Sequence, residues 1–194
     1  MADGTLKVGT ITTSSGSGTI TIGQSGETIT VPSGATFSAT AGTMSGQNYP
    51  AFQAFLSVSQ TLNNDTITTI AWDSETFDSD SNFDTSNYRF TPNKAGKYLV
   101  YVTCNIDAGS GIYYASSEVQ KNGSNIPSSR IVNIWENLSS SDYSIEGIFL
   151  SYQGIVDMNG SSDYLTANAY MAGGGSAGNI ILNRTIWGAY RIGA

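Results

Sequence analysis

The sequence predicts an all-β protein, and three observations support this prediction. Charged residues make up only 12% of the 194 residues, about half the usual globular fraction, whereas helix surfaces need Glu, Lys and Arg. From Tyr49 onward, short apolar runs alternate with turn signals such as Asn63-Asn64-Asp65 and Lys121-Asn122-Gly123-Ser124. No segment shows the apolar period of an amphipathic helix. About eight short strands punctuated in this way indicate a sandwich or jelly roll.

The expected strands follow one another closely along the chain. They are rich in β-branched and aromatic residues, which favour strands, and lie within residues 51–58, 67–72, 98–106, 112–119, 131–135, 143–152, 164–171 and 180–192. Asn122-Gly123 predicts a type I′ hairpin turn, in which both residues need positive φ. Gly96 suits a tight turn before a buried strand. Gly188 would allow a close backbone approach in the last strand.

Residues 1–48 differ from the rest and predict a separate segment. They contain a single Phe and neither Trp nor Tyr, whereas residues 49–194 hold all three Trp and all eleven Tyr. Aromatic side chains dominate the energetics of a core. We therefore expect a knob at 49–194, preceded by a short Gly/Thr-rich N-terminal segment at 1–48.

Pairs of alternating apolar residues recur in this segment. They are Leu6/Val8, Ile20/Ile22 and Ile29/Val31, and alternation of this kind indicates short β-repeats. Each repeat has too few apolar side chains to form a core alone. We expect an intertwined shaft or a peg that attaches the knob to a larger structure, and a flexible linker is the alternative.

Charge excludes several partner classes. The net charge is −7, with only eight Lys and Arg, so nucleic acid and anionic membrane surfaces are not expected as partners. No apolar stretch reaches the length needed to span a bilayer. The start, Met1-Ala2-Asp3-Gly4, has neither the basic nor the apolar part of a signal peptide, so we expect synthesis in the cytosol without export by the common route.

The inventory of reactive side chains argues against an enzyme. The chain has no His, so no Ser-His-Asp or Cys-His site can form. Paired carboxylates could in principle hydrolyse glycosides, but we expect no enzymatic activity. The single cysteine, Cys104, lies inside an apolar run and is expected to be a small buried hydrophobe. An interchain disulfide or a reactive thiol is the alternative.

Six motifs from Ala51 to Tyr190 resemble landmarks of one family, in the family's order. They are Ala51-Phe52-Gln53-Ala54-Phe55, Ile70-Ala71-Trp72-Asp73, Tyr88-Arg89-Phe90-Thr91-Pro92, Ala95-Gly96-Lys97-Tyr98-Leu99-Val100, Val119-Gln120-Lys121-Asn122-Gly123-Ser124 and Ile186-Trp187-Gly188-Ala189-Tyr190. The knob thus resembles the globular head of complement component one-q and its tumour-necrosis-factor-like relatives. The resemblance implies a ten-stranded jelly roll that assembles as a homotrimer, and it implies no activity of its own.

The N-terminal segment carries a second resemblance. It lacks the collagen stalk of animal relatives, and stretches such as Gly18-Thr19-Ile20-Thr21-Ile22-Gly23 resemble structural proteins of tailed bacteriophages. That resemblance implies a virion protein assembled in the host cytoplasm. Residues 1–48 would then contact other virion proteins.

An acidic segment at residues 73–84 is a candidate metal site. Asp78, Asp80 and Asp84 could offer oxygen ligands to calcium. An EF-hand loop is excluded because Phe83 stands where that loop needs Gly and Arg89 where it needs Glu. A solvated acidic loop without metal is the favoured alternative, and no other cofactor is expected.

Three aromatic residues are candidates for ligand binding. Tyr113 and Tyr114 follow a Gly-Ser-Gly turn, and Trp135 lies near Asn137. Exposed rings with amides nearby suit the stacking of a host surface glycan. The favoured alternative places these rings in the core or the trimer interface.

These observations lead to one main hypothesis and two rivals. The first is a non-enzymatic structural protein of a tailed phage: a trimeric head decoration, head fibre or small tail fibre that projects a jelly-roll knob. The second is a receptor-binding fibre tip that recognises a host surface glycan or protein. The third is a secreted cytokine-like or complement-like ligand.

Overall fold

The computed structural model describes residues 9–13, 18–36, 50–108, 112–134, 145–173 and 177–193. The chain divides into two compact units, Met1–Gly46 and Gln47–Ala194. The boundary predicted from the sequence lies between residues 48 and 49. Across the described ranges, no helix is long and apolar enough to cross a membrane.

The described residues of the first unit form turns without strands. No strand is assigned within 9–13 or 18–36, and turns close where Glu27 N donates to Gln24 O and Ala35 N to Pro32 O, both at 3.0 Å. The repeats expected at Ile20/Ile22 and Ile29/Val31 are therefore not strands in this single chain. Their side chains are exposed, because two apolar residues per repeat bury too little area without a neighbouring strand. The Leu6/Val8 pair lies outside the described residues.

The second unit is all-β in its described parts and contains fourteen strands. They are β1 (Ala51–Phe55), β2 (Gln60–Leu62), β3 (Thr68–Thr69), β4 (Ser74–Asp78), β5 (Phe83–Asp84), β6 (Arg89–Phe90), β7 (Ala95–Ala108), β8 (Ile112–Lys121), β9 (Ser124–Asn125), β10 (Ile131–Ile134), β11 (Ile145–Asn159), β12 (Leu165–Gly173), β13 (Gly178–Ile180) and β14 (Ile186–Gly193). The count exceeds the expected ten because six of these strands are only two or three residues long.

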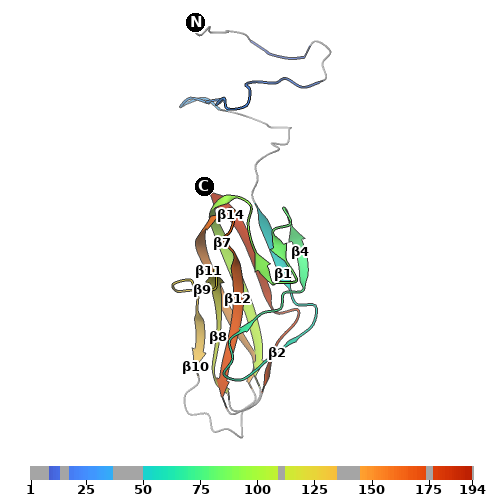
Figure 1. Ribbon diagram of the computed structural model, residues 1–194, viewed down its shortest axis with the longest axis vertical. Helices are drawn as coiled ribbons and strands as arrows, with labels where there is room; N and C mark the ends of the chain where they lie inside the picture. The colour runs from blue at the N-terminus through green and yellow to red at the C-terminus, as the bar shows by residue number, and fades with distance from the viewer. Residues whose placement is uncertain are drawn as a thin grey trace. The chain divides into compact units, whose positions relative to one another are not determined.

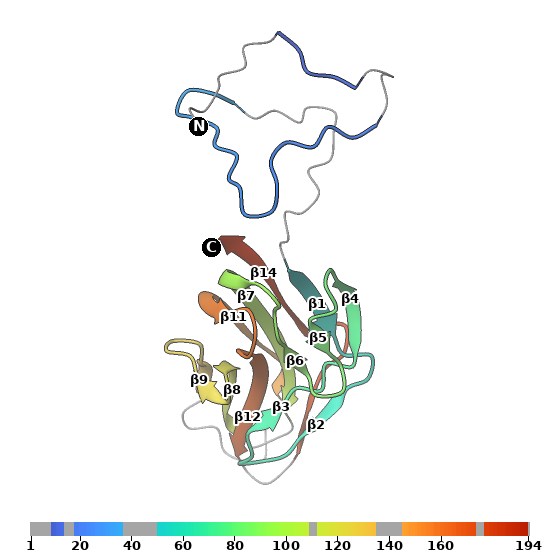
Figure 2. The same cartoon turned by 45° about the horizontal axis from the view of Figure 1, so that its top comes forward.

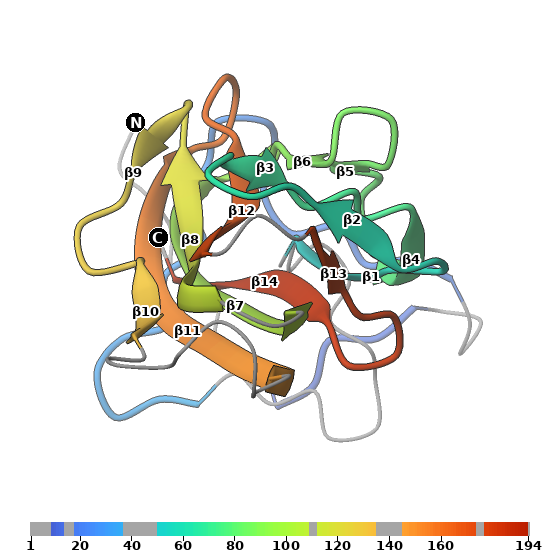
Figure 3. The same ribbon diagram turned by 90° about the horizontal axis from the view of Figure 1, so that it is seen from below.

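The strands form two seven-stranded sheets that pack face to face. Sheet A has the order β2-β13-β7-β14-β1-β4, and β11 also pairs with β7. Sheet B has the order β10-β8-β12-β6-β5, with β3 on β12 and β9 on β8. Figure 1 shows the long strands running along this unit, and Figure 2 shows short β3, β5 and β6 beside them. Figure 3 shows the two layers nearly end-on. The sandwich prediction is confirmed.

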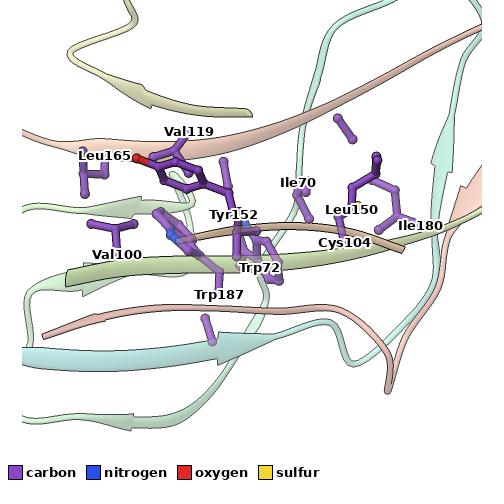
Figure 4. Close-up of a cluster of buried hydrophobic side chains, with 14 of the residues drawn as sticks. Ile70, Trp72, Val100, Cys104, Val119, Leu150, Tyr152, Leu165, Ile180 and Trp187 are labelled. Carbon is purple, nitrogen blue, oxygen red and sulfur yellow. The ribbon is translucent and has the colours of Figure 1, made fainter. Parts of the chain in front are cut away.

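Alternating residues of both sheets fill the core between the layers. On β7, Tyr98, Val100 and Val102 are buried, and Trp187 of the neighbouring β14 is fully buried. Figure 4 shows Val100 and Trp187 in this core. The ring of Phe52 stacks on that of Phe90 at 4.4 Å between centroids and meets Trp187 edge-on at 5.0 Å. Edge-on and offset contacts of this kind stabilise aromatic cores beyond area burial.

Cys104 occupies the same core and is fully buried. Burial raises the pKa of its thiol to about 12. A thiol that stays protonated is a poor nucleophile. The prediction of a small buried hydrophobe is therefore confirmed.

One turn prediction and one prediction of a close backbone approach are also confirmed. Asn122 and Gly123 have φ angles of 53° and 76°, as a type I′ turn between β8 and β9 requires. A Cβ atom on Gly188 would lie 2.7 Å from the carbonyl oxygen of Phe52 and would also collide with Tyr101. Only glycine fits there without displacing its neighbours.

The segment around the acidic residues differs from its prediction. A strand was expected within residues 67–72, yet β3 covers only Thr68–Thr69. The acidic segment expected as a loop instead contains the edge strand β4, which pairs with β1. Ser74–Asp78 has little apolar alternation, so its pairing depends on the exposed edge of β1 rather than on its own pattern.

Candidate functional site

The outward face of sheet A exposes several large apolar side chains and is termed the sheet A face. Among its exposed side chains are Phe149 and Ile155 on β11, Tyr190 and Ile186 on β14, and Phe77 on β4. Phe149 and Ile155 are 59% and 60% exposed. These residues share one face because partner positions in the antiparallel register point the same way. Large exposed apolar side chains that share one face are candidates for an interaction surface.

The centre of this face is flat because Tyr101 lies over a glycine. Tyr101 pairs with Gly188 of β14, and Gly188 pairs with Gln53 of β1. The Tyr101 hydroxyl donates to Gln53 Oε1 at 2.9 Å. Burial, and then the neighbouring Tyr190, raise the pKa of Tyr101. The ring therefore packs along the sheet and its hydroxyl stays protonated near neutral pH.

A pocket of about 290 Å³ lies on the outward face of sheet B. Its walls include Tyr113, Tyr114 and Tyr170, and its floor includes Glu118 and Asn168. The register of β8 and β12 brings these residues together, since Tyr114 lies opposite Ala172 and Glu118 opposite Asn168. The rings of Tyr114 and Tyr170 meet edge to face at 5.6 Å between centroids. This volume is near the lower end of the range for small-molecule sites, about 300–1,000 Å³.

A β-bulge explains why both tyrosines of β8 reach this pocket. Ala172 pairs with Tyr114 and Gly173 with Ile112, so Tyr113 has no partner in the ladder. An extra residue in one strand changes the direction of its side chain. Tyr113 would otherwise face the core, but it is 55% exposed. The bulge therefore places two consecutive tyrosines at the same pocket.

An ion pair forms one side of the pocket. Arg130 donates from Nε to Glu118 Oε2 at 2.7 Å, and its Nη2 lies 2.6 Å from the same oxygen. Gln120 Nε2 donates to Glu118 Oε1 at 2.9 Å. The hydrogen bond from Arg130 to Glu118 raises the pKa of the guanidinium. Glu118 is almost fully buried, and a buried carboxylate needs partners of this kind.

The residues expected at a calcium site make local hydrogen bonds. Asp78 Oδ2 accepts from Phe83 N at 2.7 Å, and Asp84 accepts from the backbone and hydroxyl of Ser86 at 2.8 and 2.6 Å. Those bonds from Ser86, followed by Asn87, lower the pKa of Asp84 to about 2. Within the described residues, no group of three or more Asp, Glu or Cys side chains is placed to hold a metal ion. Calcium binding by Asp78, Asp80 and Asp84 stays a prediction.

The predicted ligand-binding residues divide into two groups. Tyr113 and Tyr114 lie together at the pocket of sheet B, whereas Trp135 lies outside the described residues. Sequence reasoning missed Glu118, Asn168 and Tyr170. These three residues lie on two strands separated by the whole of β9, β10 and β11. The polar residues of β8 and β12 at alternate positions were the available signal, because they interrupt strands that are otherwise buried.

Comparison with known proteins supports the fold and nothing finer. No protein-family model matches the sequence, and no curated protein matches it. Among solved structures, the globular domain of zebrafish complement 1qA matches with a TM-score of 0.50 at 13% identity, covering 75% of this chain and 98% of that chain. Crystal structures of murine APRIL at pH 8.0 and pH 8.5 match with TM-scores of 0.53 and 0.52 at 11% identity, covering 75% of this chain and 100% of theirs. The second unit therefore has the jelly-roll fold of the complement one-q head and of APRIL.

Proposed function

We propose that this chain is a non-enzymatic binding and structural protein that works as a homotrimer. The sheet A face is the observation that carries the proposal. Phe149, Ile155 and Tyr190 are exposed on this face, and its ion pair, Lys97–Asp157, lies toward one end of β7 and β11. A protein with a net charge of −7 repels its own copies unless they meet through an uncharged surface. A second and third copy of this chain are therefore the occupants that this face fits best.

The shape of the face supports the same occupant. Gly188 and Tyr101 keep its centre flat, which lets a neighbouring copy of the chain approach this face closely. Closed symmetric oligomers are the common outcome for soluble chains that bury an apolar face. Solved structures with this fold include the complement 1qA globular domain and APRIL.

The setting we propose is the particle of a tailed phage. The support is the resemblance of the Gly/Thr-rich N-terminal segment to phage structural proteins. In this setting residues 1–48 hold the protein to other virion proteins and the knob projects outward. A head decoration, a head fibre and a small tail fibre all fit this arrangement.

A receptor-binding tip is the second candidate, and the pocket of sheet B favours it. A decoration needs no ligand pocket, whereas a tip needs one that faces away from the assembly. A secreted ligand like those of the complement or cytokine type shares the same fold. Finding the protein in purified particles supports the first two roles and argues against the third.

Light scattering on the purified chain tests the trimer. We expect a mass near three times 20.4 kDa. Ile155→Arg should give a monomer, because burying an unpaired guanidinium in an apolar interface costs on the order of several kcal/mol. Val132→Arg is the matched control, because Val132 is an exposed apolar residue of sheet B, and it should remain trimeric. A monomeric wild-type chain would contradict the proposal.

A further inference from the structure

Asn168 lies in the floor of the sheet B pocket with an amide oxygen that lacks a hydrogen-bond partner. The residue is 2% exposed, and its Oδ1 accepts no hydrogen bond. Its neighbours across the sheet are Glu118 of β8 and Thr69 of β3, and Glu118 already has its own partners. A buried amide oxygen without a hydrogen bond costs about 1–3 kcal/mol, so native proteins rarely keep one without a reason. Asn168 lines this pocket, so a ligand bound there lies beside its side-chain amide.

The walls of the pocket present aromatic ring faces. Tyr170 is fixed because its hydroxyl donates to Asp65 Oδ1 at 3.1 Å, and its ring meets that of Tyr114 edge to face. Tyr113 joins them through the bulge in β8. Tyrosine combines an apolar ring with a polar hydroxyl. These walls therefore suit a ligand that has both an apolar face and hydroxyl groups.

The electrostatics of the pocket select against charged ligands. Glu118 and Arg130 neutralise each other at 2.6 Å, and both Glu118 oxygens accept hydrogen bonds within the protein. A ligand carboxylate would compete with Glu118 for Arg130, and a ligand ammonium would compete with Arg130 for Glu118. A neutral hydroxyl avoids both conflicts, since it can donate to Asn168 Oδ1 or accept from its Nδ2.

We infer that this pocket binds one neutral pyranose residue, the ring stacked on Tyr170 and a hydroxyl hydrogen-bonded to the amide of Asn168. A pyranose offers an apolar C–H face together with hydroxyls that donate and accept, and the 290 Å³ volume suits one ring. The inference rests on the proposed binding role and deepens it by naming the ligand class. In this arrangement Tyr114 forms part of the pocket wall, and the sugar ring stacks on Tyr170.

The position of the pocket is compatible with the trimer. It opens on the outward face of sheet B, whereas the proposed contacts between copies use the outward face of sheet A. The pocket therefore lies outside the face that we propose for contacts between copies. Three weak sites on one particle component bind a repeated glycan far more tightly than one site does.

Saturation-transfer NMR on the full-length chain tests the inference. The probes are glucose, galactose, mannose and N-acetylglucosamine, with glucuronic acid and glucosamine as charged comparators. We expect at least one neutral sugar to bind in the millimolar range and the charged comparators to bind more weakly. A polysaccharide of the responding sugar should bind the trimer more tightly than the free sugar, and equal binding would point to a free monosaccharide as ligand.

Two substitutions separate ligand binding from folding. Asn168→Leu should preserve or raise the thermal midpoint, because it removes an unpartnered buried amide, and should weaken sugar binding about tenfold or more. Tyr170→Phe should retain binding and Tyr170→Ala should abolish it. Asn179→Leu, an exposed amide on β13, is the matched control and should bind as wild type does.

Three outcomes would overturn the inference. They are no response to any neutral sugar at high millimolar concentration, unchanged binding by Asn168→Leu, and equal binding of the charged comparators. Light scattering on the same samples reports the trimer independently. A trimer that binds no sugar rejects the pocket and keeps the proposed assembly, whereas a monomer that binds sugar rejects the assembly and keeps the pocket.

Discussion

Gly188 controls the shape of the sheet A face although it contributes no side chain. The ring of Tyr101 lies where its Cβ would be, and the Phe52 carbonyl oxygen is 2.7 Å from the same point. We expect Gly188→Ala to lower the free energy of unfolding by about 1–3 kcal/mol, as overpacking does, and to weaken the trimer by tilting Tyr101. Chemical denaturation and light scattering measure the two effects.

Gly193 provides the control for this residue within the same strand. No atom lies within 4 Å of a Cβ built on Gly193, and neither glycine has a positive φ. Gly193→Ala should therefore change the free energy of unfolding by less than about 0.5 kcal/mol. Similar losses in both variants would mean that strand propensity, rather than close packing under Tyr101, explains the need for Gly188.

At the scale of elements, Asp163 ties two turns together. Its carboxylate accepts from Asn122 Nδ2 at 2.8 Å in the β8–β9 turn and from Asn159 N at 2.9 Å in the β11–β12 turn. Lys121 Nζ lies 2.8 Å away. The hydrogen bond from Lys121, followed by that from Asn122, lowers the pKa of Asp163. We expect Asp163→Asn to cost about 1–3 kcal/mol at neutral pH.

The pH dependence of that cost follows from the direction of the pKa shift. Because the pKa of Asp163 is lower in the folded chain, its contribution to stability is complete above the unfolded value of 3.8. It is lost as the pH falls toward the folded value. The difference between Asp163→Asn and wild type should therefore shrink below about pH 4. Asp157→Asn, at an exposed ion pair with Lys97, should cost little at any pH.

Local pattern predicted the long strands and missed what depends on pairing. Apolar alternation located β7, β8, β11 and β12, because each of these strands carries enough apolar residues of its own to show the pattern. Alternation could not locate β4, because this strand has a single large apolar residue, Phe77. Its strand conformation comes from pairing with the edge of β1. The residues of the pocket were predicted in part for the same reason. The adjacent Tyr113 and Tyr114 were found, whereas Asn168 and Tyr170 join them only through the register between β8 and β12.

At the scale of the whole molecule, the two faces of the sandwich have different roles. The sheet A face is apolar and uncharged at its centre, whereas the outward face of sheet B holds the pocket with its ion pair and amide. Three copies would together carry three times the net charge of −7. Contact through the uncharged face directs most of this charge to solvent, where salt screens it. The same arrangement leaves the pockets accessible.

The division of the chain into two units leads to the last prediction. Every residue of the described core lies between Phe52 and Ala189, so a chain without residues 1–48 retains all of that core. We expect this truncated chain to keep the thermal midpoint of the full chain and its mass near three copies. If the first unit attaches the knob to phage particles, the truncated chain should be absent from particles purified from infected cells, while the full chain copurifies with them. If the truncated chain is incorporated as efficiently as the full chain, the knob itself attaches to the particle. Other copies of this chain and the particle surface would then compete for the sheet A face.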